Sequence, residues 1–253
     1  MDKTVTFSPQ LAMPAYLGLA SELQWRSLGP EYFEQWLSLR NVVLQALDEP
    51  DCYVREKDEK AFFQQHSLPL GQCIGVFQGS DLVAYAMVGL PSATAPDNLA
   101  RIAGLPAQMH HRVAHLASCM VHPAWRGHHL QVRLLRIRFA VAQAWGRSHC
   151  LAMVSLRNDA SRHNLLSQGL SIIWTGWIDG LPRHVMAVNL REPANEPPTT
   201  KDVWCGSQDF EQLRLLSNMG MHGVGELRSP EGVRLRFVPA KAINETDHCG
   251  EPI

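Results

Sequence analysis

The chain contains 253 residues, of which 45% are hydrophobic and 19% are charged, and its formal net charge at pH 7 is −1. This composition is typical of a soluble globular protein with a sizeable core, and the balanced charge gives no overall attraction to nucleic acid or to an anionic membrane. The six cysteines include no C-x-x-C pair, which disfavours a disulfide framework or a structural zinc site, so we expect a reducing, cytoplasmic location and no metal.

The N-terminal segment does not resemble a signal peptide, because Pro9 and Pro14 interrupt its apolar residues and no basic start precedes them. No apolar stretch elsewhere approaches the length that crosses a membrane. We therefore expect no membrane partner.

Two helices, a hairpin and a loop are predicted in the first half of the chain. Residues 30–49 carry an apolar stripe of helical period, and residues 55–66 predict a shorter helix. Residues 71–90 contain two strand-like runs around a turn, which is typical of a β-hairpin. Residues 92–112 are small and polar, so we expect a loop that could contain a helical turn and could lie over a cleft.

A strand, a helix and a second strand follow. Residues 114–121 and 149–156 are apolar runs of strand length, and a helix over about 127–145 separates them. The two strands should be parallel, with a right-handed crossover that brings the turn close to the carboxyl end of the second strand. Several arginines form a local cluster without a nucleic-acid-binding motif: Arg133, Arg136, Arg138 and Arg147.

The remaining chain predicts a short helix, a hairpin and an extension. Asn158 or Asp159 suits the cap of a helix that ends at Gly169, and residues 171–190 predict a hairpin. We divide the chain into a first domain (1–193), a proline-rich linker (194–201), a helix and hairpin packed on the first domain (202–240), and a flexible tail (241–253).

The turn H-P-A-W-R-G-H-H-L-Q, which starts at His122, joins the first strand of this unit to its helix. The first N–H groups of a helix have no backbone partners, and an anion can bind them. The sequence therefore suggests a local anion site at this turn.

The strand, this turn, the amphipathic helix and the run L-L-S-Q-G-L after N-D-A-S resemble the acyl-CoA-binding core of GCN5-related N-acetyltransferases, over about residues 114–175. Arg126 and Gly127 fit the usual turn of that family, whereas His129 and Gln131 stand where small residues are usual. The resemblance implies a mixed α/β fold, in which helices flank a mostly antiparallel central sheet, with the C-terminal helix and hairpin as an extension.

The resemblance also implies transfer of an acyl group, most often acetyl, from acetyl-CoA to an amine by direct attack. The backbone of Cys119 and Val121 would bind the pantetheine arm, a nearby N–H would polarise the thioester carbonyl, and the turn would hold the pyrophosphate. Asn158 would contact the arm or only cap its helix. The expected cofactor-binding residues are Met120, Val121, Arg126, Gly127, His128, His129, Leu130, Gln131, Asn158 and Ser161.

The acid and base are less defined, because Leu165 stands where many members of the family have the Tyr that protonates the CoA thiolate. His115 could be a base if it faces the cleft. Other groups in range of the site are Ser161, His163, Cys119 and His122, and acceptor-side acids are Asp48, Glu49 and Asp51. From these we take Cys119, His115 and Ser161 as the catalytic candidates.

We therefore expect an N-acetyltransferase that acts on a primary amine of a small molecule or peptide, with no nucleic-acid partner and with homodimer formation left open. The acceptor should lie between the first helix pair, the 91–111 loop and the hairpin around Trp174 and Trp177. The alternative is a non-catalytic CoA-binding or protein-interaction module, which His129, Gln131 and Leu165 favour.

Overall fold

The computed structural model describes residues 23–192 and 202–240. Their strands form one sheet in the order β1-β2-β3-β4-β5-β7-β6-β9-β10-β8, in which only β4 and β5 are parallel neighbours. The strands are β1 (Leu23–Ser27), β2 (Gly71–Gln78), β3 (Asp81–Gly89), β4 (Val113–Val121), β5 (His149–Ser155), β6 (Ser171–Ile178), β7 (Leu181–Asn189), β8 (Val203–Gly206), β9 (Met221–Ser229) and β10 (Gly232–Pro239).

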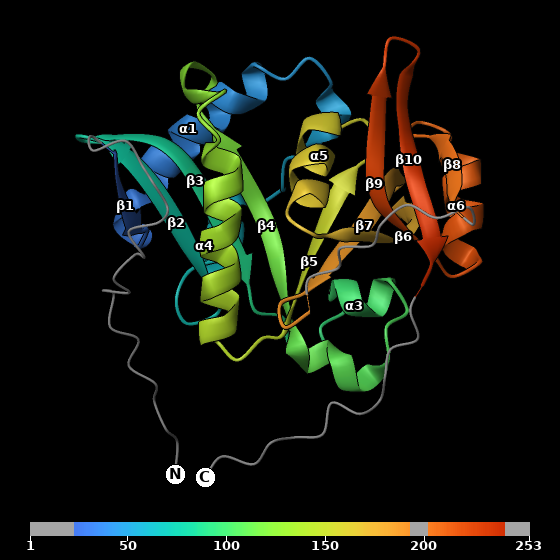
Figure 1. Cartoon of the computed structure of the whole chain (residues 1–253). Coiled ribbons are helices and arrows are strands. Elements are labelled where there is room, and N and C mark those ends of the chain that lie inside the picture. Colours follow the sequence, from blue (N-terminus) through green and yellow to red (C-terminus); the bar gives the residue numbers. More distant parts are fainter. Residues whose placement is uncertain (1–22, 193–201, 241–253) are drawn as a thin grey trace.

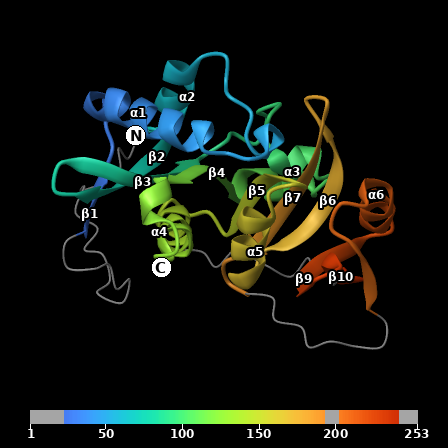
Figure 2. The ribbon, with the colours of Figure 1, turned by 90° about the horizontal axis from the view of Figure 1, so that it is seen from above.

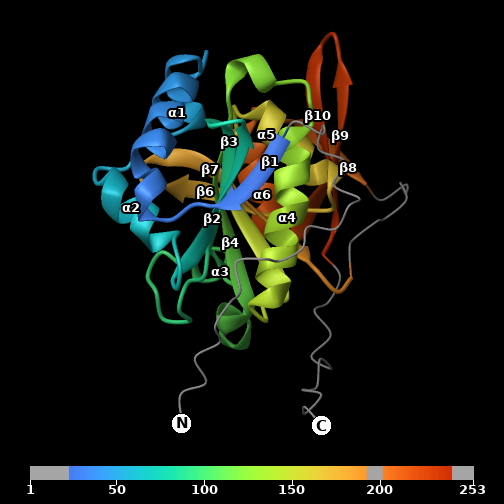
Figure 3. The same cartoon turned by 90° about the vertical axis from the view of Figure 1, so that its left-hand side faces the viewer.

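Helices cover both faces of this sheet, with α1 and α2 on one face and α4 and α5 on the other (Figures 1, 2 and 3). The α-helices are α1 (Phe33–Gln45), α2 (Glu59–Gln65), α3 (Leu99–Ile102), α4 (Leu130–Ala144), α5 (Asp159–Ser167) and α6 (Phe210–Asn218). The predicted mixed, mostly antiparallel sheet flanked by helices is confirmed. Among the described residues, no helix is long and apolar enough to span a bilayer.

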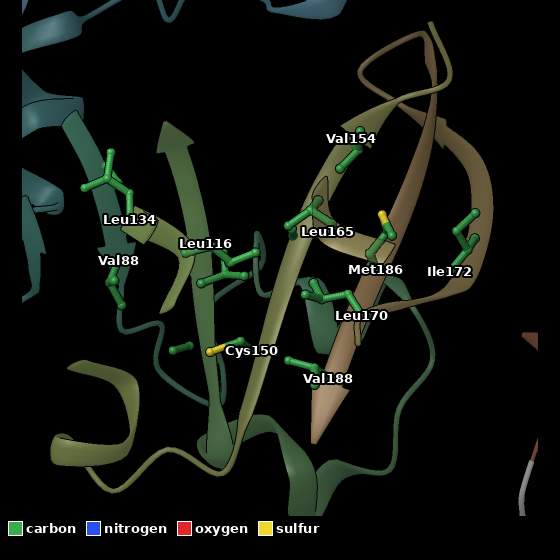
Figure 4. Packing of buried hydrophobic residues seen from close by; sticks show 14 of the residues in the cluster. Val88, Leu116, Leu134, Cys150, Val154, Leu165, Leu170, Ile172, Met186 and Val188 are labelled. Carbon is green, nitrogen blue, oxygen red and sulfur yellow. The ribbon is translucent and has the colours of Figure 1, made fainter. Parts of the chain in front are cut away.

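Each helical layer has its own hydrophobic cluster. Leu134 and Leu165 bring α4 and α5 onto the sheet, where they join Leu116, Cys150 and Val154 in the larger cluster (Figure 4). On the opposite face, Trp36 of α1 and Phe63 of α2 pack in one cluster with Phe77 of β2 and Tyr85 of β3. The sheet is therefore buried on both sides around β4, where the parallel pair lies.

The strand, helix and strand predicted over residues 114–156 are confirmed, and the hairpin of 71–90 forms β2 and β3. Helix α4 begins three residues later than predicted, because Gly127 and His129 both have left-handed backbones, with φ of 82° and 56°. Such φ values interrupt a right-handed helix. The turn thus stays open up to Leu130.

The C-terminal segment extends the same sheet, since β9 pairs with β6 through Ile172 and Gly223. A side chain at 223 would meet Ile172 and Phe237 at 3.1 Å, so glycine permits this close approach. Helix α6 is joined to β6 by a 3.0 Å hydrogen bond from the Thr175 N–H to the Ser217 hydroxyl oxygen. The proposed linker and tail lie outside the described residues, so the domain boundaries stay a prediction.

Two short strands were not predicted, whereas the helical turn that residues 92–112 allowed is present as α3. Both β1 and β8 are brief strands of five and four residues, and each has only one buried residue. Helix α3 interrupts the 92–112 loop and packs against Val113 and Leu151. Because none of the residues 92–112 lines the cavity described below, the expectation that this loop lies over the cleft is wrong.

Candidate active site

The parallel strands β4 and β5 pair only where Val113, Ala114 and His115 face His149, Cys150 and Leu151, and they diverge beyond that point (Figures 1 and 4). A cavity of about 260 Å³ occupies this strand gap. Its wall includes Leu116 and Leu165 from the α4/α5 cluster and Tyr53 and Phe62 from the α1/α2 layer. The cavity thus passes through the sheet, with a face beside α4 and α5 and a face beside the segment between α1 and α2.

A bulge in β4 shapes the cavity wall. Cys119 pairs with Ala86 and Leu116 with Val88, so Ala117 and Ser118 together oppose a single residue of β3. Beyond the bulge, the His122 N–H bonds the Val83 carbonyl on β3 at 2.9 Å. Because backbone groups alternate along a strand, those of Cys119 and Val121 point away from β3 and towards the gap. This is the orientation that the sequence prediction required of them.

The turn before α4 carries unpaired donors. Between Gly127 and Val132, no N–H has an acceptor within the described parts of the chain. Arg126, Gly127, His128 and His129 are exposed, and Leu130 is buried as the first residue of α4. Several donors at a helix N-terminus form a site for an anion such as a pyrophosphate. Gln131 lines the cavity, where its side-chain oxygen accepts a 2.7 Å hydrogen bond from Asn164.

Helix α5 brings two predicted residues to the same cavity. Asn158 caps the helix, since its Oδ1 accepts a 3.0 Å hydrogen bond from the Ser161 N–H, and both residues line the cavity wall. The side-chain nitrogen Nδ2 of Asn158 has no hydrogen-bond acceptor among the described residues. Capping and ligand contact are therefore compatible at Asn158.

Of the three catalytic candidates, Cys119 and Ser161 line the cavity and His115 does not. Burial raises the pKa of the Cys119 thiol above its ordinary 9.0, although the nearby charge of Arg138 opposes this, so the group is a neutral thiol at pH 7. The Nε2 atom of His115 accepts a 3.1 Å hydrogen bond from the Leu99 N–H, and burial lowers the pKa of His115 to about 4. His115 therefore holds α3 on the face of the sheet away from α4, outside the cavity.

Two further histidines are also engaged elsewhere. His122 accepts a hydrogen bond from the Ala124 N–H at 3.2 Å, and His163 lies 2.8 Å from a Glu226 oxygen on β9. Neither lines the cavity. Leu165, in the position where the family commonly has Tyr, is buried and lines it.

A polar group on the α1/α2 face was missed by the sequence reasoning. Tyr53 and Glu56, from the segment between α1 and α2, line the cavity together with Ser118. The buried Arg40 donates to the Tyr53 hydroxyl at 2.7 Å and pairs with Glu56, and the Tyr53 hydroxyl lies 3.4 Å from the Glu56 Oε1. Burial raises the pKa of Tyr53, with Arg40 opposing, so its hydroxyl is protonated at pH 7.

The acceptor lining expected from the sequence is only partly correct. The segment between the first two helices contributes, as does the β6–β7 turn through Ile178, Asp179 and Leu181. Trp174 and Trp177 do not line the cavity; the ring of Trp177 lies 4.9 Å from that of Phe210. Arg138, one of the local cluster of arginines noted in the sequence, is buried and lines the cavity. Arg183 of β7 is also buried and lines it.

Comparison with solved structures decides the fold family. An N-acetyltransferase of Staphylococcus aureus matches with a TM-score of 0.51 and 17% identity, covering 67% of this chain and 99% of that protein. A putative acetyltransferase of Acinetobacter baylyi gives 0.51 and 14%, covering 69% and 97%. A putative acetyltransferase of Salmonella typhimurium, solved with acetyl-CoA, gives 0.50 and 18%, covering 68% and 98%.

This chain has the GCN5-related N-acetyltransferase fold. The fold that the turn motif predicted is thus confirmed. No protein-family model and no curated protein sequence matches the chain. At identities of 14 to 18%, the likeness establishes the N-acetyltransferase fold alone.

Proposed function

We propose that the protein is an N-acyltransferase that moves an acyl group, acetyl in the simplest case, from CoA to a primary amine of a small molecule or peptide. The supporting observation is the cavity through the β4–β5 gap beside a turn with unpaired N–H donors. A thioester and an amine entering from opposite faces of one gap would meet inside it. Holding two reactants together in this way supplies much of the rate of such reactions.

The α4/α5 face would hold the donor. The N–H groups of residues 127–132 would bind the CoA pyrophosphate, and the backbone of Cys119 and Val121 would bind the pantetheine arm. Asn158 and Ser161 would add side-chain hydrogen bonds from α5.

Of the predicted cofactor-binding residues, this assignment retains Val121, residues 127–131, Asn158 and Ser161. It leaves out Met120, whose side chain is buried in the α1/α2 cluster, and the N–H of Arg126, which donates to the Pro123 carbonyl at 3.2 Å. Of the catalytic candidates it leaves out His115, which lies outside the cavity.

In the proposed reaction the neutral amine nitrogen attacks the thioester carbonyl carbon. The backbone N–H of Cys119, which points into the gap, would stabilise the negative oxygen that develops. The C–S bond then breaks, the nitrogen loses a proton, and the products are an amide and the free CoA thiol.

The proton needs an acceptor and a donor, which Glu56 and Tyr53 would supply. Glu56 would take the proton from nitrogen, and the Tyr53 hydroxyl would protonate the leaving thiolate and regain a proton from Glu56 across the 3.4 Å contact. Arg40 would hold both side chains in position, while Cys119 and Ser161 are further hydrogen donors in the cavity wall.

The second candidate is a module that binds CoA without turnover. Three features favour it: His129 and Gln131 replace the small residues of the turn, and Leu165 replaces the usual acid. Gln131 in particular places a side chain in the cavity wall.

Amine-dependent thiol release separates the two. The full chain is incubated with acetyl-CoA and a panel of amines and peptides, and free CoA thiol is measured over time. We expect release that requires both substrates. Binding of acetyl-CoA by calorimetry without any amine-dependent release would favour the non-catalytic module, and absence of binding would overturn both.

A further inference from the structure

Arg138 is a charged side chain built into the cavity wall. It extends from the buried face of α4, its side chain is 3% exposed, and it lines the cavity in the strand gap. Its Nη1 donates a 3.3 Å hydrogen bond to the carbonyl of Ala117 in the β4 bulge, and its Nε is buried without a partner. The guanidinium therefore uses only a small part of its donor capacity within the protein.

The charge of Arg138 also lacks a counter-ion. Three other buried arginines each have a carboxylate within 4 Å: Arg40 pairs with Glu56 and Glu59, Arg162 with Asp159 and Glu226, and Arg236 with Asp202. A fourth, Arg183 of β7, also lines the cavity without a carboxylate of the described chain within 4 Å, but its charge interacts with those of Asp51 and Asp179. No carboxylate of the described residues lies that close to Arg138. Because burying an unpaired charge is costly, a buried arginine without a counter-ion beside a cavity points to an anion from outside the protein.

The position of Arg138 indicates which end of a bound donor would supply that anion. It lies eight residues beyond Leu130, or about 12 Å along the helix at 1.5 Å per residue, so it is far from the turn that would hold the pyrophosphate. Its contact with Ala117 places it near the narrow end of the gap, just beyond the paired residues His115 and Leu151. An acyl chain directed from the thioester towards that narrow end would bring its terminus to the guanidinium.

We propose that Arg138 binds a carboxylate at the free end of the acyl group, so that the preferred donor is the CoA thioester of a short dicarboxylic acid. This inference rests on the proposed function and specifies its donor. Acetyl-CoA would bind the same turn but would leave Arg138 unpaired.

A carboxylate on the acceptor is the other possible source of the anion. The acceptor face contains Glu56 and Asp179 in the cavity wall, which suit the ammonium form of an arriving amine. Arg183 also lies in this wall, but its charge already interacts with those of Asp51 and Asp179. Arg138 extends from α4 on the opposite face. The donor therefore accounts for it better.

The test compares two stable CoA thioethers of equal chain length, carboxypropyl-CoA and butyl-CoA, by calorimetry with the full chain and no amine present. We expect the carboxylate compound to bind about tenfold to 100-fold more tightly, as for a hydrogen bond to a charged group. Arg138→Met should abolish this preference while changing butyl-CoA affinity by less than about threefold. Arg136→Met, which removes an exposed arginine from the same helix, should retain it.

The outcomes separate this inference from the function on which it rests. Equal binding of the two compounds to the wild-type chain, or a preference that survives in Arg138→Met, would overturn the inference and leave acyl transfer intact. If Arg138→Met does not fold, Arg138→Lys is tested in its place. Loss of the planar guanidinium should reduce the preference for carboxypropyl-CoA, and an unchanged preference would overturn the role of Arg138. Failure of every CoA compound to bind would overturn the proposed function itself.

Discussion

The Nε of Arg162 on α5 lies 3.5 Å from the Oε2 of Glu226 on β9, and both side chains are almost fully buried. The other oxygen of Glu226 contacts His163 at 2.8 Å and Arg228 at 2.7 Å. Arg162 also donates to the Leu156 carbonyl at 2.8 Å, at the end of β5. The C-terminal strands are thereby attached to the helix that carries Asn158 and Ser161.

Glu226→Gln should destabilise the protein by about 2–3 kcal/mol, because it removes one charge of a buried pair and leaves Arg162 less compensated. Urea unfolding gives the free energy of unfolding. Glu231→Gln, an exposed change in the turn of the same hairpin, is the control and should cost under about 0.5 kcal/mol. Equal stabilities of the two variants would show that the Arg162–Glu226 contact is not important for stability.

Stability should fall as the pH falls below 6.5. Burial lowers the pKa of His184 to about 3 and that of His115 to about 4, from an ordinary 6.5. Between each lowered pKa and 6.5, the unfolded chain therefore binds more protons than the folded one. In that range each histidine lowers the free energy of unfolding by about 1.4 kcal/mol for every unit that the pH falls, and this stabilisation is complete above pH 6.5.

The variant His184→Asn tests this slope, because its side-chain oxygen can replace the Nδ1 that lies 2.9 Å from the Thr175 hydroxyl. Chemical denaturation at several pH values should give a shallower decline for the variant between pH 6 and pH 4, by about 1.4 kcal/mol per unit. Parallel curves for variant and wild type would contradict a neutral buried His184.

Gly127→Ala should weaken acetyl-CoA binding about tenfold or more, since a side chain strains the left-handed residue and alters the turn that presents the donors. Gly146→Ala is a matched control at the other end of α4. Gly146 has φ of 70°, Gly127 has φ of 82°, and both positions have open space for a Cβ. Both variants should lose similar stability, but calorimetry should show the affinity loss only at position 127. If Gly127→Ala and Gly146→Ala bind acetyl-CoA with equal affinity, the turn is not part of the donor site.

Tyr53→Phe should lower kcat about 100-fold or more if the hydroxyl protonates the thiolate, while acetyl-CoA affinity stays within about twofold. Tyr32→Phe removes a hydroxyl that does not line the cavity and should leave kcat unchanged. Steady-state thiol release and calorimetry measure the two quantities. If Tyr53→Phe has the wild-type kcat, Tyr53 is not the acid, and Cys119 or Ser161 would be the remaining candidates.

The sequence predicted the parallel strand pair, the turn and the capping residue Asn158 because each has a local pattern. Arg138 had such a signal too, since it stands four residues after Leu134 and three before Val141, in the buried stripe of the helix. Because of its charge, we grouped it with neighbouring arginines as a local cluster and not with the buried stripe. The helical period was the better guide, because an arginine can be buried where a cavity or a ligand accepts its charge.

Tyr53 and Glu56 could not be found in this way. They lie about sixty residues before Ser118 in the chain and reach the cavity only because α1 and α2 pack on the far face of the sheet. The segment between α1 and α2 is irregular, so it has no helical or strand periodicity from which its place at the cavity could be predicted. The prediction that His115 is catalytic was wrong for a related reason. Its strand was predicted correctly, but the side of the strand that faces the cavity depends on the bulge at Ala117 and Ser118.

The most direct test of acyl transfer in the β4–β5 gap is mass spectrometry of an amine incubated with the full chain and isotopically labelled acetyl-CoA or succinyl-CoA. We expect a labelled amide that forms only with active protein and is reduced about 100-fold in Tyr53→Phe. If the wild-type chain binds acyl-CoA but transfers no label to any amine or peptide in a broad panel, the catalytic account is contradicted.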